Sequence, residues 1–327
     1  MTRPFYRIAI IGCGRMGRLH TARLHEDGRA RVATLFDVDI AAAQSLQRDL
    51  APTATVHNDV DAMLQASGID AAVICTPTSA HFDQIRACRE RGLAVLCEKP
   101  LADSAERTQQ LICESQTGPP LEVAYQRRSW ATYRTLRREV AAGCWGPIRA
   151  VTSHNAEYWQ QTIAGTWRDD PQMNPGGFLG DAGSHKLDAL LFVTGLRPAS
   201  VFARSDNCGS RVPIVTTASV MTHEGVPVAL DFIGNAHHQA EDLQIHCEGA
   251  DLMIRDWRVW IARGNVVQPL GPPEPDSHPA PTFLDVLDGT RENPAPAECA
   301  WPVFMLTEAI LESSRSGLPV AVELDVD

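Results

Sequence analysis

The sequence contains no long hydrophobic run, and this excludes a membrane-spanning helix. Its longest uninterrupted apolar stretches, such as residues 189–193, fall far short of the roughly 20 residues needed to cross a bilayer. The N-terminus also lacks the apolar core and small-residue cleavage site of a secretory signal. We therefore expect a cytoplasmic protein with no membrane partner.

The chain also lacks paired cysteines and an excess of positive charge. Its nine cysteines are an odd number, widely spread and without a Cys-x-x-Cys pair, which is typical of buried thiols in a reducing compartment. The net charge of −11 would repel phosphate backbones, so we expect no nucleic-acid partner. His237 and His238 are adjacent on a predicted strand and would point to opposite faces, so we expect no metal site.

The 327 residues have room for about two domains of roughly 150 residues each. Over the first ~120 residues, short β-branched apolar runs alternate with helical segments. The strand-like runs are 7–11, 31–36, 71–75, 93–97 and 121–125. Strict alternation of strand and helix predicts a doubly wound parallel sheet covered on both faces.

The pattern changes after this region, where several strand-like runs follow one another with little helix between them. The main ones are 148–153, 200–204, 216–221, 226–232, 243–247 and 259–262. Short turns between successive strands predict a mostly antiparallel, open-faced sheet with helices on one face, which makes this an α+β domain. We place the boundary between residues 123 and 124.

A glycine-rich turn separates the first strand from the first helix. Gly12, Gly14 and Gly17 fit the G-x-G-x-x-G spacing, and the helix begins near Arg15 and Met16. In such a turn the first glycine permits the bend, the second leaves space for a pyrophosphate, and the third allows close helix–sheet packing. The free N–H groups at the helix start then face the phosphates, which predicts a dinucleotide site. The alternative is that these glycines serve packing alone.

An acidic residue ends the second strand, 25 residues after Gly12. The carboxylate of Asp37 would accept hydrogen bonds from both hydroxyls of an adenosine ribose and repel a 2′-phosphate, so NADP is less favoured than NAD. Asp39 is the nearest alternative for this role, but its position is better explained as a helix cap. Asp37 would otherwise be a solvated residue at the end of a strand.

Glu98, Lys99 and Pro100 directly follow a buried strand, at the sheet edge where doubly wound folds bind ligands. A partly desolvated Lys99 beside a cationic nicotinamide could exchange a proton with a substrate hydroxyl. A cis peptide before Pro100 would aim Lys99 inward. The alternative is an ordinary solvated lysine.

A second polar group lies in the C-terminal half. On a helix Asp181, His185 and Asp188 share one face, and a carboxylate one turn from an imidazole can orient it for proton transfer. The glycines that precede them would let the loop approach a ligand closely. The alternative makes Asp181 a helix cap and His185 a core residue.

Four ordered motifs together resemble those of the Gfo/Idh/MocA oxidoreductases. They are Gly12-x-Gly14-x-x-Gly17, residues 76–81, Glu98-Lys99-Pro100, and Gly176-Gly177-x-x-x-Asp181-x-Gly183-x-His185-x-x-Asp188. The resemblance implies that residues 1–123 form an NAD-binding Rossmann domain. It implies that residues 124–327 form a substrate-binding and oligomerisation domain, and we expect a homodimer or homotetramer.

The resemblance also implies roles for individual residues. Lys99 and His185 would handle the proton, Asp181 would support substrate and histidine, and His81 would brace the cofactor loop. The cofactor-binding residues would be Gly12, Gly14, Arg15, Met16, Asp37, Thr76, Pro77, Glu98 and Lys99. The expected substrate-binding residues, in a pocket between the domains, are Arg127, Trp167, Arg168, Asp181 and His185.

Two tryptophans, Trp159 and Trp167, could stack on a sugar ring, and Arg168 could bind its hydroxyls or a carboxylate. For each tryptophan, aromatic packing or an oligomer contact is the alternative. The expected reaction is hydride transfer between NAD and a carbinol carbon of a sugar, cyclitol or related polyhydroxy compound. An NAD-using glycosidase or lyase, acting through transient oxidation, is the second hypothesis. A non-enzymatic dinucleotide sensor is the third, although it would be expected to have lost Lys99 or His185.

Overall fold

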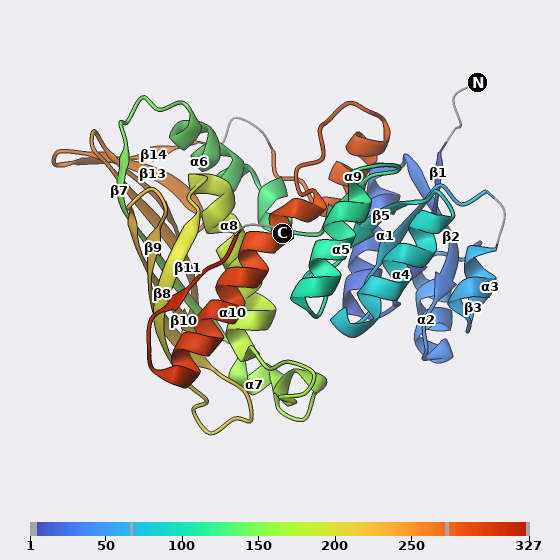
Figure 1. Cartoon of the computed structure of the whole chain (residues 1–327). Helices are drawn as coiled ribbons and strands as arrows, with labels where there is room; N and C mark the ends of the chain where they lie inside the picture. Colours follow the sequence, from blue (N-terminus) through green and yellow to red (C-terminus); the bar gives the residue numbers. More distant parts are fainter. Residues whose placement is uncertain (1–4, 66–67, 272–274, 325–327) are drawn as a thin grey trace. The chain divides into compact units, whose positions relative to one another are not determined.

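The computed structural model describes residues 5–65, 68–271 and 275–324, and the chain divides into two compact units (Figure 1). Unit 1 comprises Met1–Ser129 and Ser277–Ala300, and unit 2 comprises Trp130–Asp276 and Trp301–Asp327. This division differs from a single boundary after residue 123, because the chain returns to unit 1 late in the sequence. The return is explained by Phe283 and Leu284, which are fully buried in the core of unit 1.

Unit 1 contains a six-stranded parallel sheet in the order β3-β2-β1-β4-β5-β6, which confirms the doubly wound prediction. Its strands are β1 (Tyr6–Ile11), β2 (Ala30–Phe36), β3 (Thr55–His57), β4 (Ala71–Ile74), β5 (Ala94–Cys97) and β6 (Leu121–Val123). The strand order reverses at β1, since β2 and β3 lie on one side of it and β4 to β6 on the other. Ligands of such sheets bind at the carboxyl ends of the strands beside this reversal.

The helices of unit 1 follow the predicted alternation. They are α1 (Arg15–Asp27), α2 (Ile40–Leu50), α3 (Val60–Leu64), α4 (Thr78–Glu90), α5 (Ala105–Ser115) and α9 (Pro279–Leu287), with 3₁₀ turns η1 (Gln126–Ser129) and η4 (Ala297–Cys299). Helix α1 ends at Gly28 in the left-handed region, as expected. The N-cap of α5 is Ser104, whose hydroxyl oxygen accepts a hydrogen bond from the Arg107 N–H at 3.2 Å. Asp103 instead contacts the Arg107 guanidinium.

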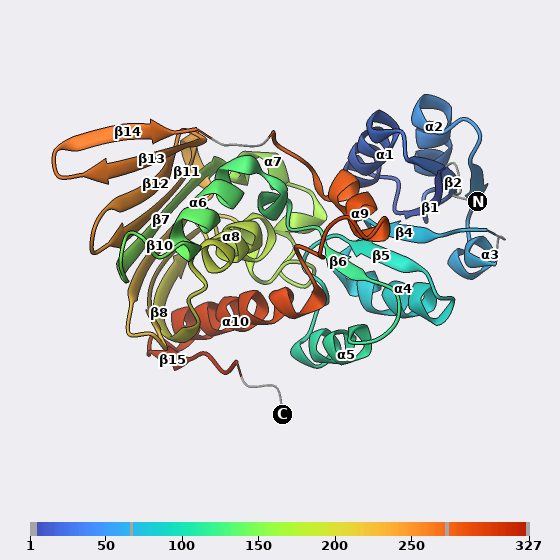
Figure 2. The ribbon, with the colours of Figure 1, turned by 90° about the horizontal axis from the view of Figure 1, so that it is seen from above.

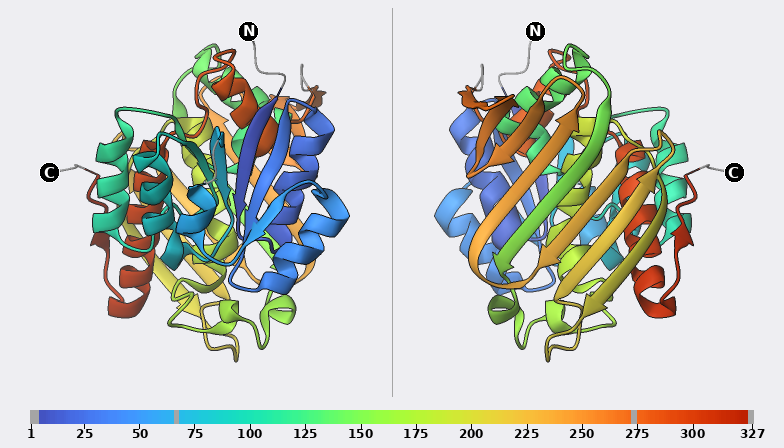
Figure 3. Two further views of the ribbon diagram at one scale, coloured as in Figure 1. Left: turned by 90° about the vertical axis from the view of Figure 1, so that its right-hand side faces the viewer. Right: turned by 90° about the vertical axis from the view of Figure 1, so that its left-hand side faces the viewer.

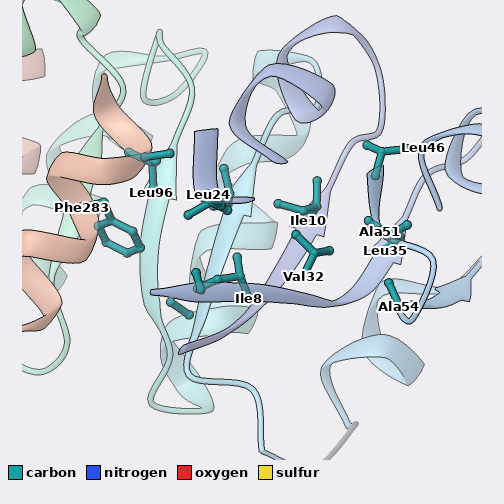
Figure 4. Close-up of a cluster of buried hydrophobic side chains, with 14 of the residues drawn as sticks. Ile8, Ile10, Leu24, Val32, Leu35, Leu46, Ala51, Ala54, Leu96 and Phe283 are labelled. Atoms are coloured by element: carbon teal, nitrogen blue, oxygen red, sulfur yellow. The ribbon is translucent and has the colours of Figure 1, made fainter. Parts of the chain in front are cut away.

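An apolar cluster packs one face of the unit 1 sheet against helices α1, α2 and α9 (Figure 4). Ile8 and Ile10 of β1 and Leu96 of β5 are fully buried, together with Leu24 of α1 and Phe283 of α9. Each such side chain contributes about 2 kcal/mol by leaving water. The core therefore fixes the strand ends from which the ligand-facing residues project.

Unit 2 contains a nine-stranded sheet in the order β14-β13-β12-β11-β7-β10-β9-β8-β15. Its strands are β7 (Ile148–Tyr158), β8 (Pro198–Asp206), β9 (Val215–Thr222), β10 (Pro227–Ile233), β11 (Asn235–Cys247), β12 (Asp251–Arg255), β13 (Arg258–Arg263), β14 (Val266–Leu270) and β15 (Val320–Ala321). All neighbours pair antiparallel except β7 and β10, which run parallel. The mostly antiparallel prediction is confirmed.

Helices lie along one face of this sheet (Figure 2). They are α6 (Ala131–Ala141), α8 (Ser184–Thr194) and α10 (Ala300–Ser316), while α7 (Gln160–Ile163), η2 (Trp167–Asp169) and the π-helical η3 (Leu179–Gly183) form connections. Every second residue of β9 is buried, as a strand with one covered face requires. Within the described residues, no helix covers the other face (Figure 3). Nor does any helix in these ranges combine the length and apolar character needed to span a bilayer.

Candidate functional site

The glycine-rich turn after β1 leaves no room for side chains at two of its three glycines. Gly12 has φ +95, and a Cβ there would lie 2.6 Å from the carbonyl carbon of Cys75. A Cβ at Gly17 would lie 2.0 Å from the Gly12 carbonyl oxygen. At Gly14 no atom lies within 4 Å of such a Cβ, so this position faces open space. The first and last glycines therefore serve the bend and the packing, and the middle one leaves the space that a ligand needs.

The first turn of α1 directs unused N–H groups into this space. Its N-cap is Gly14, which supplies no side-chain hydrogen bond, and the turn contains no acidic residue. The side chains of Arg15 and Met16 are exposed and half-buried, respectively. A helix N-terminus of this kind binds anions through its N–H groups and its dipole. The turn therefore fits a pyrophosphate.

Asp37 is fixed beside the turn by two backbone donors. Its Oδ2 accepts a hydrogen bond from the Cys13 N–H at 2.7 Å, and its Oδ1 accepts one from the Asp39 N–H at 2.9 Å. Burial and then the Asp37 charge raise the pKa of the Cys13 thiol to about 12, so that thiol stays neutral. Asp39 caps α2 by accepting the Ala41 N–H at 3.0 Å, which confirms its predicted role.

The loops after β4 and β5 are joined by a buried histidine. His81 is 1% exposed, with Nδ1 2.8 Å from the Pro100 carbonyl oxygen and Nε2 2.9 Å from that of Thr76. Burial lowers the pKa of His81, and the two carbonyl contacts oppose this shift; a neutral imidazole has one N–H and donates to only one of the two oxygens. The Lys99–Pro100 peptide is cis, as anticipated from the sequence. This bridge ties Thr76 and Pro77 to the turn that contains Lys99.

Glu98 forms a buried pair that sequence reasoning missed. It is 8% exposed, and its Oε1 lies 3.0 Å from Nε2 of His20, which is 3% exposed. His20 lies on the buried face of α1 with Gly17 and Leu24. A histidine at helical spacing among apolar and small residues is the signal that could have found it.

In unit 2 the polar residues depend on a tightly bent segment. Gly177 has φ +54, and a Cβ there would lie 2.0 Å from the Pro213 carbonyl oxygen. The chain then enters the π-helical η3, which contains Asp181, and only afterwards begins α8. Asp181 is therefore not the cap of α8. Because a π-helix turns less per residue, Asp181 and His185 are also not one regular α-helical turn apart.

Asp181 instead pairs with an arginine of the preceding loop. Its Oδ2 accepts a hydrogen bond from Arg168 Nε at 2.7 Å; the two side chains are 15% and 41% exposed. The Arg168 guanidinium also lies over the ring of Trp167, 4.4 Å from its centroid. Trp159, by contrast, is buried and packs on Phe178 with ring centroids 5.4 Å apart, so the packing alternative describes it better.

Helix α8 is anchored by a charged cluster that the sequence analysis did not single out. Lys186 is buried, and its Nζ lies 2.5 Å from Glu157 Oε1 and 3.6 Å from Glu241 Oε2. Its neighbour His185 is half-buried, and Asp188 is fully buried. Since Glu157 is on β7 and Glu241 on β11, this cluster fixes the first turn of α8 to the sheet.

The predicted site residues thus fall into two groups. Unit 1 brings the cofactor set together after β1, β2, β4 and β5, and it also contains Arg127, which is 5% exposed. Unit 2 contains Trp167, Arg168, Asp181 and His185. Throughout the described ranges, no three His, Cys, Asp or Glu side chains are grouped to hold a metal ion.

Two family models match the chain, one for each half. The model for the Gfo/Idh/MocA oxidoreductase family, NAD-binding Rossmann fold, matches residues 6–118. The Gfo/Idh/MocA C-terminal domain model matches residues 133–253.

Curated relatives agree with this assignment. Inositol 2-dehydrogenase of Rhizobium meliloti is 30% identical over 198 residues, which are 60% of this chain and 57% of the relative. Inositol 2-dehydrogenase of Paracoccus denitrificans is 34% identical over 151 residues, 45% of each chain. The matched part of the chain therefore spans about half the length of these relatives.

Solved structures share the fold over nearly the whole chain. The WlbA dehydrogenase from Bordetella pertussis, in complex with NADH and UDP-GlcNAcA, has a TM-score of 0.83 at 23% identity, covering 98% of this chain and 100% of that one. An oxidoreductase domain protein from Kribbella flavida has a TM-score of 0.86 at 20% identity, covering 98% and 100%. With both halves matched by models of one family, this chain belongs to the Gfo/Idh/MocA oxidoreductases and carries their NAD(P)-binding Rossmann domain.

Proposed function

We propose that the protein is an NAD-dependent dehydrogenase that acts on a CH–OH carbon of a sugar, cyclitol or related polyhydroxy compound. The observation that carries the proposal is the position of Lys99, directly after β5 at the sheet edge that also holds the glycine turn. Relatives named inositol 2-dehydrogenase support the substrate class, as does a structural neighbour bound to NADH and UDP-GlcNAcA.

Asp37 supports NAD rather than NADP as the cofactor. Its two oxygens accept the N–H groups of Cys13 and Asp39, and each keeps acceptor capacity for a ribose hydroxyl. A 2′-phosphate would bring a second negative charge against this carboxylate. The pyrophosphate would lie at Gly14 and the first turn of α1.

When bound, the oxidised nicotinamide accepts a hydride from the substrate carbon. The residues of this chain then have to remove the hydroxyl proton and stabilise the developing negative charge on oxygen. We assign the proton to Lys99 or His185, whose amine and imidazole are the side chains suited to general acid–base work near neutral pH. A positive group beside the developing alkoxide lowers the barrier further.

For the substrate we propose Arg168, Asp181, Trp167, Arg127 and His185. Asp181 accepts a hydrogen bond from the Nε–H of Arg168, and the other N–H donors of a guanidinium suit hydroxyls or a carboxylate. Trp167 is 40% exposed and offers an aromatic face to a sugar ring. Asp181 would orient both Arg168 and the substrate.

The test is to identify the nucleotide that copurifies and then to screen sugars and cyclitols for NADH formation. We expect NAD to copurify and at least one polyol to yield NADH in proportion to product. Product without net NADH would identify the NAD-using glycosidase or lyase chemistry instead. No NADH from any polyol would contradict the proposed reaction.

We also propose that the protein forms a homodimer or homotetramer through the sheet face that no described helix covers. Phe202 and Met221 are 40% and 45% exposed on outward-facing positions of β8 and β9. A shallow groove lined by residues of β7, β8, β9 and β10 runs across this face. Light scattering should give a multiple of the 35.7 kDa chain mass, and a monomer would contradict this assembly.

A further inference from the structure

We propose that buried Glu98, held by His20, makes the dinucleotide site bind the oxidised, positively charged nicotinamide more tightly than the reduced, neutral one. The inference rests on the proposed use of NAD and adds to it a preference for one redox state. It concerns unit 1 alone, because both residues and all their described contacts lie there.

The sheet order indicates where each end of the cofactor would lie. The glycine turn follows β1, and Asp37 follows β2 on one side of the reversal point. A dinucleotide with its adenosine ribose at Asp37 and its pyrophosphate at Gly14 extends to the other side, over the ends of β4 and β5. Glu98 is the first residue after β5. Its carboxylate therefore belongs to the nicotinamide half of the site.

Glu98 and His20 line a small pocket. Residues of α1, the helix whose N-terminus is the predicted phosphate site, also line it. Met16, in the first turn of α1, lines this pocket together with His20, Glu98 and Gln126. The carboxylate thus faces a hollow beside the cofactor's path, with its charge only weakly screened by water.

The thiols and the imidazole at these strand ends carry no competing negative charge. Burial and then the charge of Glu98 raise the pKa values of the Cys75 and Cys97 thiols well above their usual range, so both stay neutral. Burial lowers the pKa of His81, and an imidazole carries no negative charge in either of its protonation states. Lys99 lies in the same turn and is unchanged in every variant compared.

His20 matters because it holds the carboxylate in place. With a neutral imidazole, the Nε2–H donates to Oε1 and the pair keeps a charge of −1; with an imidazolium the pair is neutral. With the neutral imidazole, replacing the carboxylate by an amide takes the pair from a charge of −1 to zero. A glutamine at position 20 would place a non-titrating N–H donor near the same point.

The experiment measures the dissociation constants of NAD⁺ and NADH on the full chain at about pH 8, above the ordinary histidine range. We expect Glu98→Gln to weaken NAD⁺ binding about tenfold, and NADH binding by less than about twofold. His20→Gln should keep the wild-type ratio. Glu122→Gln is the matched control and should keep the wild-type ratio: Glu122 is a buried carboxyl on neighbouring β6 whose pKa burial raises well above its usual range.

Equal weakening of both nucleotides in Glu98→Gln, or an unchanged ratio, would overturn the inference and leave NAD use intact. If that variant does not fold, the dissociation constants of the wild type provide the test. The wild type should bind NAD⁺ at least as tightly as NADH. If it binds NADH more than about tenfold more tightly than NAD⁺, the inference is overturned. A wild type that binds neither nucleotide would contradict the proposed function itself.

Discussion

The two units carry their predicted site residues on different kinds of backbone. In unit 1 the predicted cofactor-binding groups are backbone N–H groups and side chains at the ends of regular strands, such as Asp37 after β2 and Glu98 after β5. In unit 2 Arg168 lies in a 3₁₀ turn and Asp181 in a π-helical segment. Regular strand ends follow from local pattern, whereas irregular segments take their shape from the packing around them.

The exposed fractions of the predicted site residues also differ between the two units. Glu98 and His20 are 8% and 3% exposed, while Trp167 and Arg168 have about two fifths of their surface in solvent. A buried group with a fixed hydrogen-bond partner presents one geometry to a ligand. Exposed groups on a loop change with little cost to stability.

The largest expected effect comes from adding a methyl group at a crowded glycine of each unit. Gly17→Ala and Gly177→Ala each place a Cβ 2.0 Å from a backbone oxygen, which should cost about 3 kcal/mol of folding free energy or more. Gly17→Ala should lose NADH binding, whereas Gly177→Ala should keep it and lose turnover. NADH fluorescence on the two purified variants measures the difference.

Gly14→Ala is the control for this pair, because no atom lies within 4 Å of its Cβ position. It should keep the wild-type melting temperature and weaken only nucleotide binding. If the Gly17 and Gly177 variants lost NADH binding equally, the assignment of nucleotide binding to unit 1 and of substrate binding to unit 2 would be contradicted.

The second largest effect is expected when the Asp37 carboxylate of unit 1 is removed. Asp37→Ala should weaken NAD⁺ binding about 30-fold by removing charge-assisted hydrogen bonds, and should improve NADP⁺ binding relative to NAD⁺. The KM for the polyol should stay unchanged. Dissociation constants for both nucleotides measure this, with Asp39→Ala as a control that removes a helix cap and leaves their ratio unchanged. An unaltered ratio in Asp37→Ala would assign the ribose contact elsewhere.

A smaller effect is expected in the loop of unit 2. Arg168→Lys keeps the charge but loses the planar fork that serves Asp181 and a ligand together, so KM should rise about tenfold with NADH affinity unchanged. Steady-state kinetics with the best polyol measure the change. Arg211→Lys, at an exposed and more distant ion pair with Asp170, should have no effect. A change in NADH affinity in Arg168→Lys would place this arginine with the cofactor.

The smallest effect concerns the stability of unit 1 as pH changes. Burial raises the pKa of Glu122 well above its usual range, so the folded state keeps a proton that the unfolded chain releases above about pH 4.5. Stability is therefore lost as pH rises through this window. Glu122→Gln should gain about 1 kcal/mol over the wild type between about pH 5 and 8 in urea unfolding. Glu90→Gln, at an exposed site, should have the same pH dependence of unfolding free energy as the wild type. If all three proteins show that same pH dependence, Glu122 is ionised in the folded state.

Much of unit 1 could be predicted from the sequence because its signals are local. The turn Gly12–Gly17, the stop at Gly28 and the cap at Asp39 each depend on a few adjacent residues. The strand β3 was missed because three residues are too short to show a period. The N-cap of α5 is Ser104, although the neighbouring Asp103 is an equally suitable residue type, so only the backbone decides between them.

What the sequence did not reveal depends on contacts between distant segments. His20 meets Glu98 across 78 positions, and Lys186 meets Glu157 and Glu241 across two strands. To predict that the chain returns to unit 1 near Phe283, one would likewise have to know which apolar surface of the core no other segment covers. The π-helical geometry around Asp181 accompanies a close approach of Gly177 to Pro213, which no local pattern encodes.

The most direct test of the account measures NADH formation and NADH binding side by side on the wild type and Lys99→Met. We predict that turnover falls about a thousandfold, as the loss of a general acid–base group implies, while the dissociation constant of NADH changes by less than about threefold. A variant that keeps more than about a tenth of the wild-type turnover would contradict the role of Lys99 and assign the proton to His185 instead.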